Sequence, residues 1–207
     1  MNLNAMSKIE ADKYLKSGAE ALDIYYHDLI KRGVNPTDMV EVDFAREGVV
    51  IRDVQATGKI DKMEFRGGTI VVTDLKTGKS FDGWDSKTNT NDLSEYDKIK
   101  LHFFKYQLAY YALLIRNSRS YHQYSVEKGY IEFLEPDKSG VINILELDIT
   151  TELIDRVEKL SNLVYNKIIN LDFPNTDKYK IDDRGEEKEI KLKDIEDFES
   201  RLLEGII

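Results

Sequence analysis

The turn Gly67-Gly68 constrains the fold of this chain more than any other single feature. Strand-like runs flank it at residues 56–65 and 69–74, and adjacent glycines between two such runs are typical of a β-hairpin. A hairpin determines which residues of the two runs lie near one another. The position of each polar residue in these runs therefore predicts its neighbours in the sheet.

Asp61, Asp74 and Lys76 are the polar residues that this pairing brings together. Asp74 and Lys76 project together because side chains two residues apart share one face of a strand. Two carboxylates suit a hard divalent cation, and a neighbouring ammonium suits orienting a water or stabilising phosphate charge. The set predicts metal-assisted phosphodiester hydrolysis. Taken singly, each residue fits an ordinary strand-end aspartate or a solvated lysine equally well.

Three motifs around these residues resemble the PD-(D/E)xK nucleases, and more narrowly the RecB-like nuclease domains fused to superfamily 1 helicases. In chain order the motifs are Gly58-Lys59-Ile60-Asp61, Asp74-Leu75-Lys76-Thr77-Gly78 and Gln107-Leu108-Ala109-Tyr110-Tyr111. The specific part of the resemblance covers residues 41–111. The remainder, including residues 130–136, resembles the C-terminal domain of UvrD-related helicases with less specificity.

The resemblance implies an α/β fold with a restriction-endonuclease-like core, in which helices flank a mixed central β-sheet. It implies catalysis by Asp61, Asp74 and Lys76. Mg²⁺ or Mn²⁺ would be held by Asp61, Asp74 and the backbone carbonyl of Leu75. The implied substrate is DNA, expected to be single-stranded. The implied partner is a helicase motor, in the same polypeptide or complex, acting in DNA repair or recombination.

Glu41, Gln107 and Tyr111 are supporting candidates from the same resemblance. The family often has a glutamate in the strand before the first aspartate, and Glu41 either has that role or is an exposed strand residue. The family places Gln107 near the DNA backbone or the active-site acids. Tyr111 lies on an apolar helix stripe and fits either a DNA-binding role or simple packing.

The histidines depart from the pattern of the resemblance. RecB-like nucleases carry a metal-binding histidine upstream of the first core strand, but His27 lacks the expected small-residue context and fits a surface residue better. His102 and His122 have no ligand spacing. A catalytically silent DNA-binding or regulatory appendage of a helicase is therefore the alternative to an active nuclease. A stand-alone restriction- or repair-type endonuclease is a third reading.

Composition limits the remaining classes. We expect the 207 residues to form one nuclease domain, with a charged tail and a short terminal helix at 173–207, cut from the C-terminal part of a larger helicase. With no cysteine, the chain holds no cysteine-ligated iron–sulfur cluster of the kind some RecB-like nucleases carry. It has no Walker-type motif for ATP, no membrane-length apolar run and no signal peptide, so we expect a cytoplasmic protein.

The net charge of −9 is opposite to that of a typical DNA-binding surface. Either the acidic residues lie away from the site, or a tethered motor holds the DNA.

Periodicity predicts the order of elements along the chain. The expected helices are 9–32, 98–117, 150–170 and 193–203, and the expected strands are 40–44, 48–51, 56–65, 69–74, 125–134 and 141–147. We expect the charged residues 175–188 to be mobile. The polar residues 80–97 predict a mobile loop beside the site. This loop contains Trp84, which either stacks on an unpaired base or packs back onto the sheet.

Overall fold

The computed structural model describes residues 7–78, 80–84, 93–182 and 184–207. Its helices are α1 (Lys8–Arg32), α2 (Glu95–Arg116), α3 (Thr151–Ile169), α4 (Asp177–Lys180) and α5 (Leu192–Leu203). Its strands are β1 (Met39–Asp43), β2 (Val50–Ile51), β3 (Val54–Gln55), β4 (Lys59–Arg66), β5 (Thr69–Lys76), β6 (Ser125–Phe133) and β7 (Ile144–Asp148).

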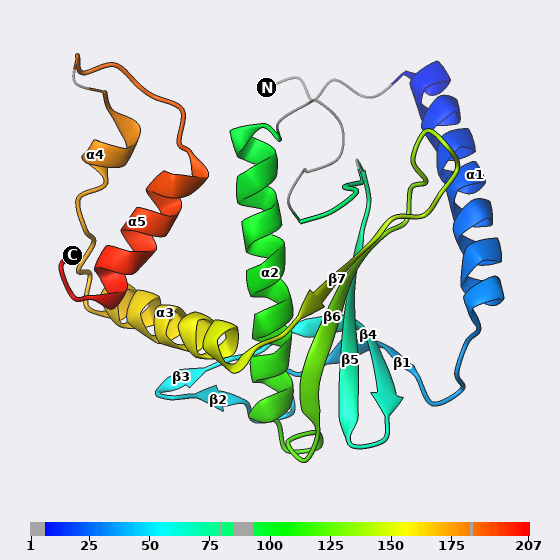
Figure 1. The fold of residues 1–207 in the computed structure, drawn as a ribbon, viewed down its shortest axis with the longest axis horizontal. Helices are drawn as coiled ribbons and strands as arrows, with labels where there is room; N and C mark the ends of the chain where they lie inside the picture. The colour runs from blue at the N-terminus through cyan, green and yellow to red at the C-terminus, as the bar shows by residue number, and fades with distance from the viewer. Residues whose placement is uncertain (1–6, 79, 85–92, 183) are drawn as a thin grey trace.

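Five strands form the central sheet in the order β1-β4-β5-β6-β7 (Figure 1). The pairs are antiparallel except β5 with β6, which is parallel. A parallel pair needs a crossover connection, and α2 supplies it. The expected α/β fold, with a mixed central sheet and flanking helices, is confirmed, as is the β4–β5 hairpin around Gly67-Gly68.

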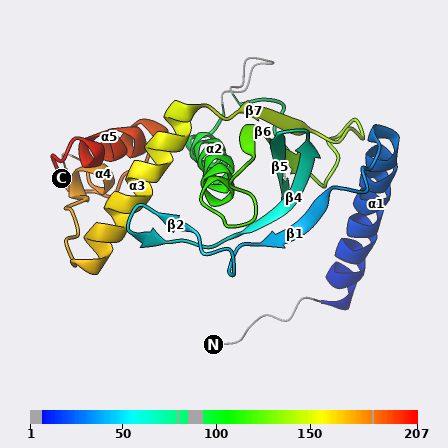
Figure 2. The ribbon, with the colours of Figure 1, turned by 90° about the horizontal axis from the view of Figure 1, so that it is seen from below.

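The crossover through α2 determines how the helices are arranged around the sheet. Figure 2 shows α2 end-on within the curve of the sheet, with α3 and α5 on one side of it and α1 on the far side of the strands. α2 is the central helix of the core because its apolar residues repeat on a broad face. The largest fully buried side chains are Phe44, Val49, Ile51, Ile60, Met63, Ile70, Leu108, Leu113, Leu114, Ile115, Ile131 and Phe133.

The long helices begin at hydroxyl residues that satisfy free backbone N–H groups. Ser7 forms a reciprocal capping box with Glu10 at the start of α1. Ser94 accepts from the N–H of Asp97 at the start of α2, and Thr150 accepts from Leu153 at the start of α3.

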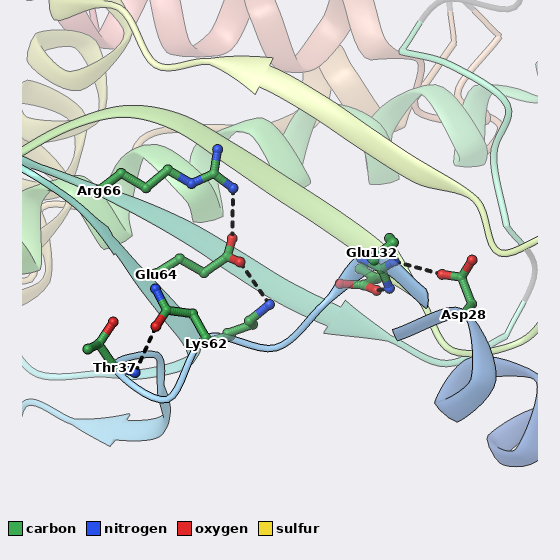
Figure 3. A network of polar contacts seen from close by, with 8 residues as sticks. Asp28, Thr37, Lys62, Glu64, Arg66 and Glu132 are labelled. Carbon is green, nitrogen blue, oxygen red and sulfur yellow. Dashed lines mark hydrogen bonds and ion pairs between the residues drawn. The ribbon is translucent and has the colours of Figure 1, made fainter. Parts of the chain in front are cut away.

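Helix α1 touches the sheet mainly through its C-terminal end. Arg32 pairs with Asp28 at 2.7 Å on its own helix and with Glu132 of β6, whose side chain is only 3% exposed (Figure 3). A separate chain of ion pairs, Lys62 to Glu64 to Arg66, follows β4 on the same face of the sheet. No residue of α1 is buried, so the apolar side chains of this helix are left largely exposed.

Three features of the observed fold differ from those expected from the sequence. Val50 and Ile51 do not extend the main sheet but pair with β3 in a separate two-stranded sheet. α2 begins at Glu95 because Ser94 caps it, so the expected loop ends before that residue, and its residues 85–92 lie outside the described part of the chain. Within residues 175–188 the structure has the short helix α4 and a bridge between Ile181 and Glu187.

The helices in the described ranges lack the combined length and apolar character that crossing a membrane requires.

Candidate active site

A row of three acidic residues crosses neighbouring strands of the sheet. Lys62 pairs with Thr73, so the next residues along β4 and β5, Asp61 and Asp74, come opposite one another. On the other side of β4, the pairs that flank Glu41 place it opposite Asp61. The hairpin register therefore brings together the acids that the sequence predicted, from three different strands.

Asp74 is a buried carboxylate, with 2% of its surface exposed. Its Oδ1 accepts a hydrogen bond of 2.7 Å from the hydroxyl of Tyr111. The ammonium of Lys76 lies 2.7 Å from Oδ2 and forms an ion pair with it. The angles of this contact do not suit a hydrogen bond, so the buried Oδ2 accepts none. A buried oxygen with spare acceptor capacity is uncommon in native proteins and marks a place for an ion or a water.

Asp61 is fixed by the backbone of the neighbouring strand. Its Oδ2 accepts a hydrogen bond of 2.8 Å from the backbone N–H of Leu75. Burial raises the pKa of Asp61, and the nearby charges of Asp74 and Glu41 raise it further, against the lowering effect of the Leu75 N–H. Crowded carboxylates of this kind are stabilised by a cation placed between them.

Lys76 is held by a closed set of hydrogen bonds with α2. Its Nζ donates to Oε1 of Gln107 at 2.9 Å, and the amide nitrogen of Gln107 donates to the hydroxyl of Tyr111 at 3.2 Å. Tyr111 returns to Asp74, which completes the circuit. Burial and the charge of Asp74 raise the pKa of Tyr111 far above its ordinary value, so it remains a neutral donor. The structure thus unites all three sequence motifs.

The glycine of the first motif has a packing role. A Cβ added at Gly58 would lie 2.8 Å from Cδ1 of Leu114 and 3.6 Å from the ring of Tyr110. The hydroxyl of Tyr110 also donates to the carbonyl of Thr57 at 3.0 Å. A side chain at residue 58 would require Leu114 to move, so glycine suits the close approach of this segment to α2.

Glu41 lies in the acidic row but at its exposed end. Its backbone φ is +54°, an uncommon value for a residue other than glycine. Its side chain is 60% exposed and pairs with Lys59. Its charge still acts on Asp61, so Glu41 can contribute to the field of the site more readily than to its buried part.

Trp84 packs back onto the sheet. Its indole N–H donates to the backbone carbonyl of Glu146 at 2.5 Å, and the ammonium of Lys105 lies 5.4 Å from the centre of its ring. The ring is partly buried against the main core. This arrangement follows the second of the two roles considered for Trp84, because both its polar and its apolar parts have partners within the chain.

The histidines lie away from the acidic row. His27 is 72% exposed on α1, with Asp23 as its neighbour, and His102 contacts Glu199 of α5 at 3.0 Å. His122 contacts backbone carbonyls of its own turn.

Phe104 is a site residue that sequence reasoning did not identify. Its ring centre lies 4.9 Å from the ammonium of Lys76, which places an aromatic face beside the cation. The signal was present, since Phe104 lies on the same helix stripe as Tyr111, but that stripe predicted core packing. Both roles coexist, because Phe104 is buried and its ring still faces Lys76.

The acids fit a divalent cation with few protein ligands. In the described residues, no three histidine, cysteine, aspartate or glutamate side chains are grouped to hold a metal ion. Mg²⁺, however, is commonly bound through one or two carboxylates, with waters and substrate phosphates completing its shell. Asp61 and Asp74 provide hard oxygen donors of that kind, and the buried Oδ2 of Asp74 has acceptor capacity to spare.

The comparisons with known proteins agree with this geometry. A family model described as the PD-(D/E)XK nuclease superfamily matches residues 6–180. The chain belongs to the PD-(D/E)XK nuclease superfamily. Membership indicates a nuclease that hydrolyses phosphodiester bonds, in a superfamily that generally uses divalent metals.

Similarity to individual proteins is low. The chain is similar to the crystal structure of SSO0001, with 18% sequence identity and a TM-score of 0.38. The match covers 79% of this chain and 63% of that one. No curated protein matches the chain.

Proposed function

We propose that this superfamily member is a metal-dependent deoxyribonuclease domain that works with a superfamily 1 helicase in DNA repair or recombination. The observation that carries the nuclease assignment is the buried Oδ2 of Asp74, opposite Asp61 and beside a lysine that α2 holds in position. A decayed site would have no reason to keep an incompletely satisfied carboxylate in the core, because such a group costs stability.

The residues have distinct roles in this proposal. Asp61, Asp74 and the carbonyl of Leu75 would hold Mg²⁺ or Mn²⁺. The bound ion would supply an acidified water and neutralise phosphate charge. Lys76, fixed between Asp74 and Gln107, orients the attacking water and stabilises the charge that develops on the phosphate. The water oxygen forms a bond to phosphorus as the bond to the leaving sugar oxygen breaks; the attacking water gives up one proton to solvent, and the leaving oxygen takes one proton from solvent.

The helicase and the single-stranded substrate are inferred from two features. The resemblance of the three motifs to RecB-like domains fused to superfamily 1 helicases supports a motor as partner. The net charge of −9 supports a division of labour in which that motor holds the DNA, because phosphate contacts alone would favour a basic surface.

A catalytically silent appendage is the second candidate. The position of His27 favours it, because that exposed residue of α1 contacts Asp23 rather than the acidic row. In this reading the fold binds DNA or regulates the motor without cutting.

Cleavage of a labelled single-stranded oligonucleotide in Mn²⁺ tests the proposal. We expect Asp74→Asn and Lys76→Ala each to reduce cutting by at least about 100-fold, the scale of losing one electrostatic stabiliser of a transition state. In calorimetry, Lys76→Ala should still bind Mn²⁺ and Asp74→Asn should not. Lys62→Ala is the matched control, since it removes a lysine from the opposite face of the same hairpin.

Cutting by Lys76→Ala at the parent rate would show that the lysine does not have the role assigned to it. A parent chain that binds DNA but does not cut it would favour the appendage.

A further inference from the structure

An apolar pocket lies where α2 meets the C-terminal helices. Its volume is about 190 Å³, below the roughly 300 Å³ at which pockets for drug-sized ligands begin. Phe103 of α2 lines it together with Ile195 and Phe198 of α5, and almost all of its accessible wall is carbon. A space of this size and character suits one flat ring system.

Phe103 is the exposed wall of this pocket. It is 52% exposed, although it lies on the helix that forms the centre of the core. A half-exposed phenyl ring at the mouth of an apolar cavity is available for stacking.

Hydrogen bonds hold the pocket open in a fixed shape. Glu199 of α5 accepts from the hydroxyl of Tyr106 at 2.6 Å and contacts His102 at 3.0 Å, so two residues of α2 that flank Phe103 are tied to α5. Arg156 of α3 donates to both Glu199 and Tyr106, at 2.9 and 2.7 Å. The two walls are therefore positioned before any ligand arrives, which reduces the entropy cost of binding.

Helix α2 links the pocket to the proposed active site, because it carries residues of both. Phe103 and Gln107 are four residues apart on α2, so they are neighbours on its surface, about 6 Å apart along the axis. Gln107 in turn binds Lys76. A strand whose phosphate lies beside Lys76 would therefore pass near the part of α2 that carries Phe103.

The chemistry of the chain favours a base as the occupant. An acidic protein obtains little affinity from phosphates, whereas stacking on an aromatic ring is independent of charge and of base identity. Trp84, the other aromatic considered for this purpose, is occupied by Glu146 and Lys105. A paired base is held in its duplex and cannot enter a cavity, so only an unpaired base meets the requirement.

We propose that this pocket accepts one unpaired base of the DNA strand whose backbone lies at Lys76, with Phe103 as the stacking residue. The inference rests on the proposed nuclease function and specifies its substrate as single-stranded or frayed DNA. The carbon-rich wall implies little preference among the four bases, because hydrogen-bond readout is absent from it.

Binding of a fluorescent oligothymidylate in Ca²⁺, followed by anisotropy, tests the pocket without cutting. We expect Phe103→Ala to weaken binding roughly 5- to 100-fold, the affinity equivalent of stacking one base. Phe103→Leu, which keeps apolar volume but removes the flat ring, should weaken binding while retaining the parent Tm. Tyr26→Ala is the matched control, since Tyr26 is 57% exposed on the distant helix α1.

A second arm replaces the oligothymidylate by an abasic strand of equal length. The parent should bind the abasic strand more weakly, and Phe103→Ala should show little difference between the two strands. Equal affinities of the parent and Phe103→Leu would overturn the proposal that the pocket binds a base. Equal binding of both strands by the parent would overturn it as well. Failure of the nuclease proposal is distinguishable, because it would appear as identical cutting by the parent and Asp74→Asn, a result that base binding does not affect.

Discussion

Tyr111 shows how one hydroxyl can join the core to the candidate site. Its ring is buried among the apolar residues of α2, and its hydroxyl is a hydrogen-bond donor to the buried carboxylate of Asp74. Buried charges are costly unless such donors surround them. Tyr111 therefore packs in the core and, through its hydroxyl, also supports the acid, a contact that its sequence position did not predict.

Tyr111→Phe should lower the free energy of unfolding by about 1–3 kcal/mol at neutral pH, because it leaves a buried carboxylate oxygen without its donor. Urea unfolding measures the change. Tyr110→Phe is the control, since its hydroxyl bonds to the backbone of Thr57 at a more exposed position and its loss should cost less. Equal losses in the two variants would show that the bond to Asp74 adds nothing.

The sequence could predict the acids but not the circuit around them. Asp61, Asp74 and Lys76 were accessible because a hairpin register follows from a turn and from the alternation of strand residues. The bonds from Gln107 to Lys76 and Tyr111 depend on the rotation and height of α2 over the sheet. That placement is determined by packing such as Leu114 against Gly58, which no local pattern encodes.

At the scale of elements, α5 is attached to α2 and α3 through the buried carboxylate of Glu199. Burial alone would raise the pKa of Glu199, but hydrogen bonds from His102, Tyr106 and Arg156 outweigh that effect and hold its pKa below the ordinary value. The periodicity of residues 193–203 predicted the helix. The partners of Glu199 could not be predicted, because they come from α2 and α3, far away in the sequence.

Glu199→Gln should destabilise the protein most at neutral pH. A carboxyl group with a lowered folded pKa contributes stability above its unfolded pKa and loses it as the pH falls through the folded pKa. Melting temperatures of the parent and variant should therefore converge as the pH is lowered below about 4.5, the ordinary value for glutamate. Glu196→Gln, an exposed neighbour on α5, should change little. A difference that is constant with pH would contradict the ionic role of Glu199.

At the scale of the whole molecule, the layers are joined with unequal strength. α2 and α3 contribute apolar residues to the same core as the sheet, whereas α1 is attached by the ion pair from Arg32 to the buried Glu132. A cavity of about 280 Å³, lined by Arg32, Lys62, Glu64 and Glu132 among others, separates α1 from the strands. The amphipathic pattern of α1 predicted a helix correctly, but it could not predict that the sheet would bury none of its residues.

Arg32→Met should destabilise the fold because it leaves Glu132 buried without its cation. The loss should be below the roughly 3–5 kcal/mol of a fully buried pair, since Arg32 is 34% exposed and Tyr25 also bonds to Glu132. The double variant Arg32→Met with Glu132→Leu should recover most of the stability in thermal unfolding. If the double variant loses as much stability as the two single variants together, the coupling between Arg32 and Glu132 is excluded.

The contact of Trp84 with Glu146 has a consequence for how copies of this protein behave beside one another. β7 is the last strand of the sheet, and outward carbonyls on such a strand can recruit a strand from another molecule. The indole of Trp84 covers one of these carbonyls, and Lys128 and Asp148 add charge nearby.

Trp84→Phe should therefore increase light scattering in concentrated samples warmed below their Tm. Tyr130→Phe, which loses a bond to the side chain of Glu146 but leaves its carbonyl covered, should scatter like the parent. Equal scattering by all three proteins would show that the indole does not protect this edge. Trp84, for which the sequence left both base stacking and packing open, would then protect the edge of the sheet against self-association.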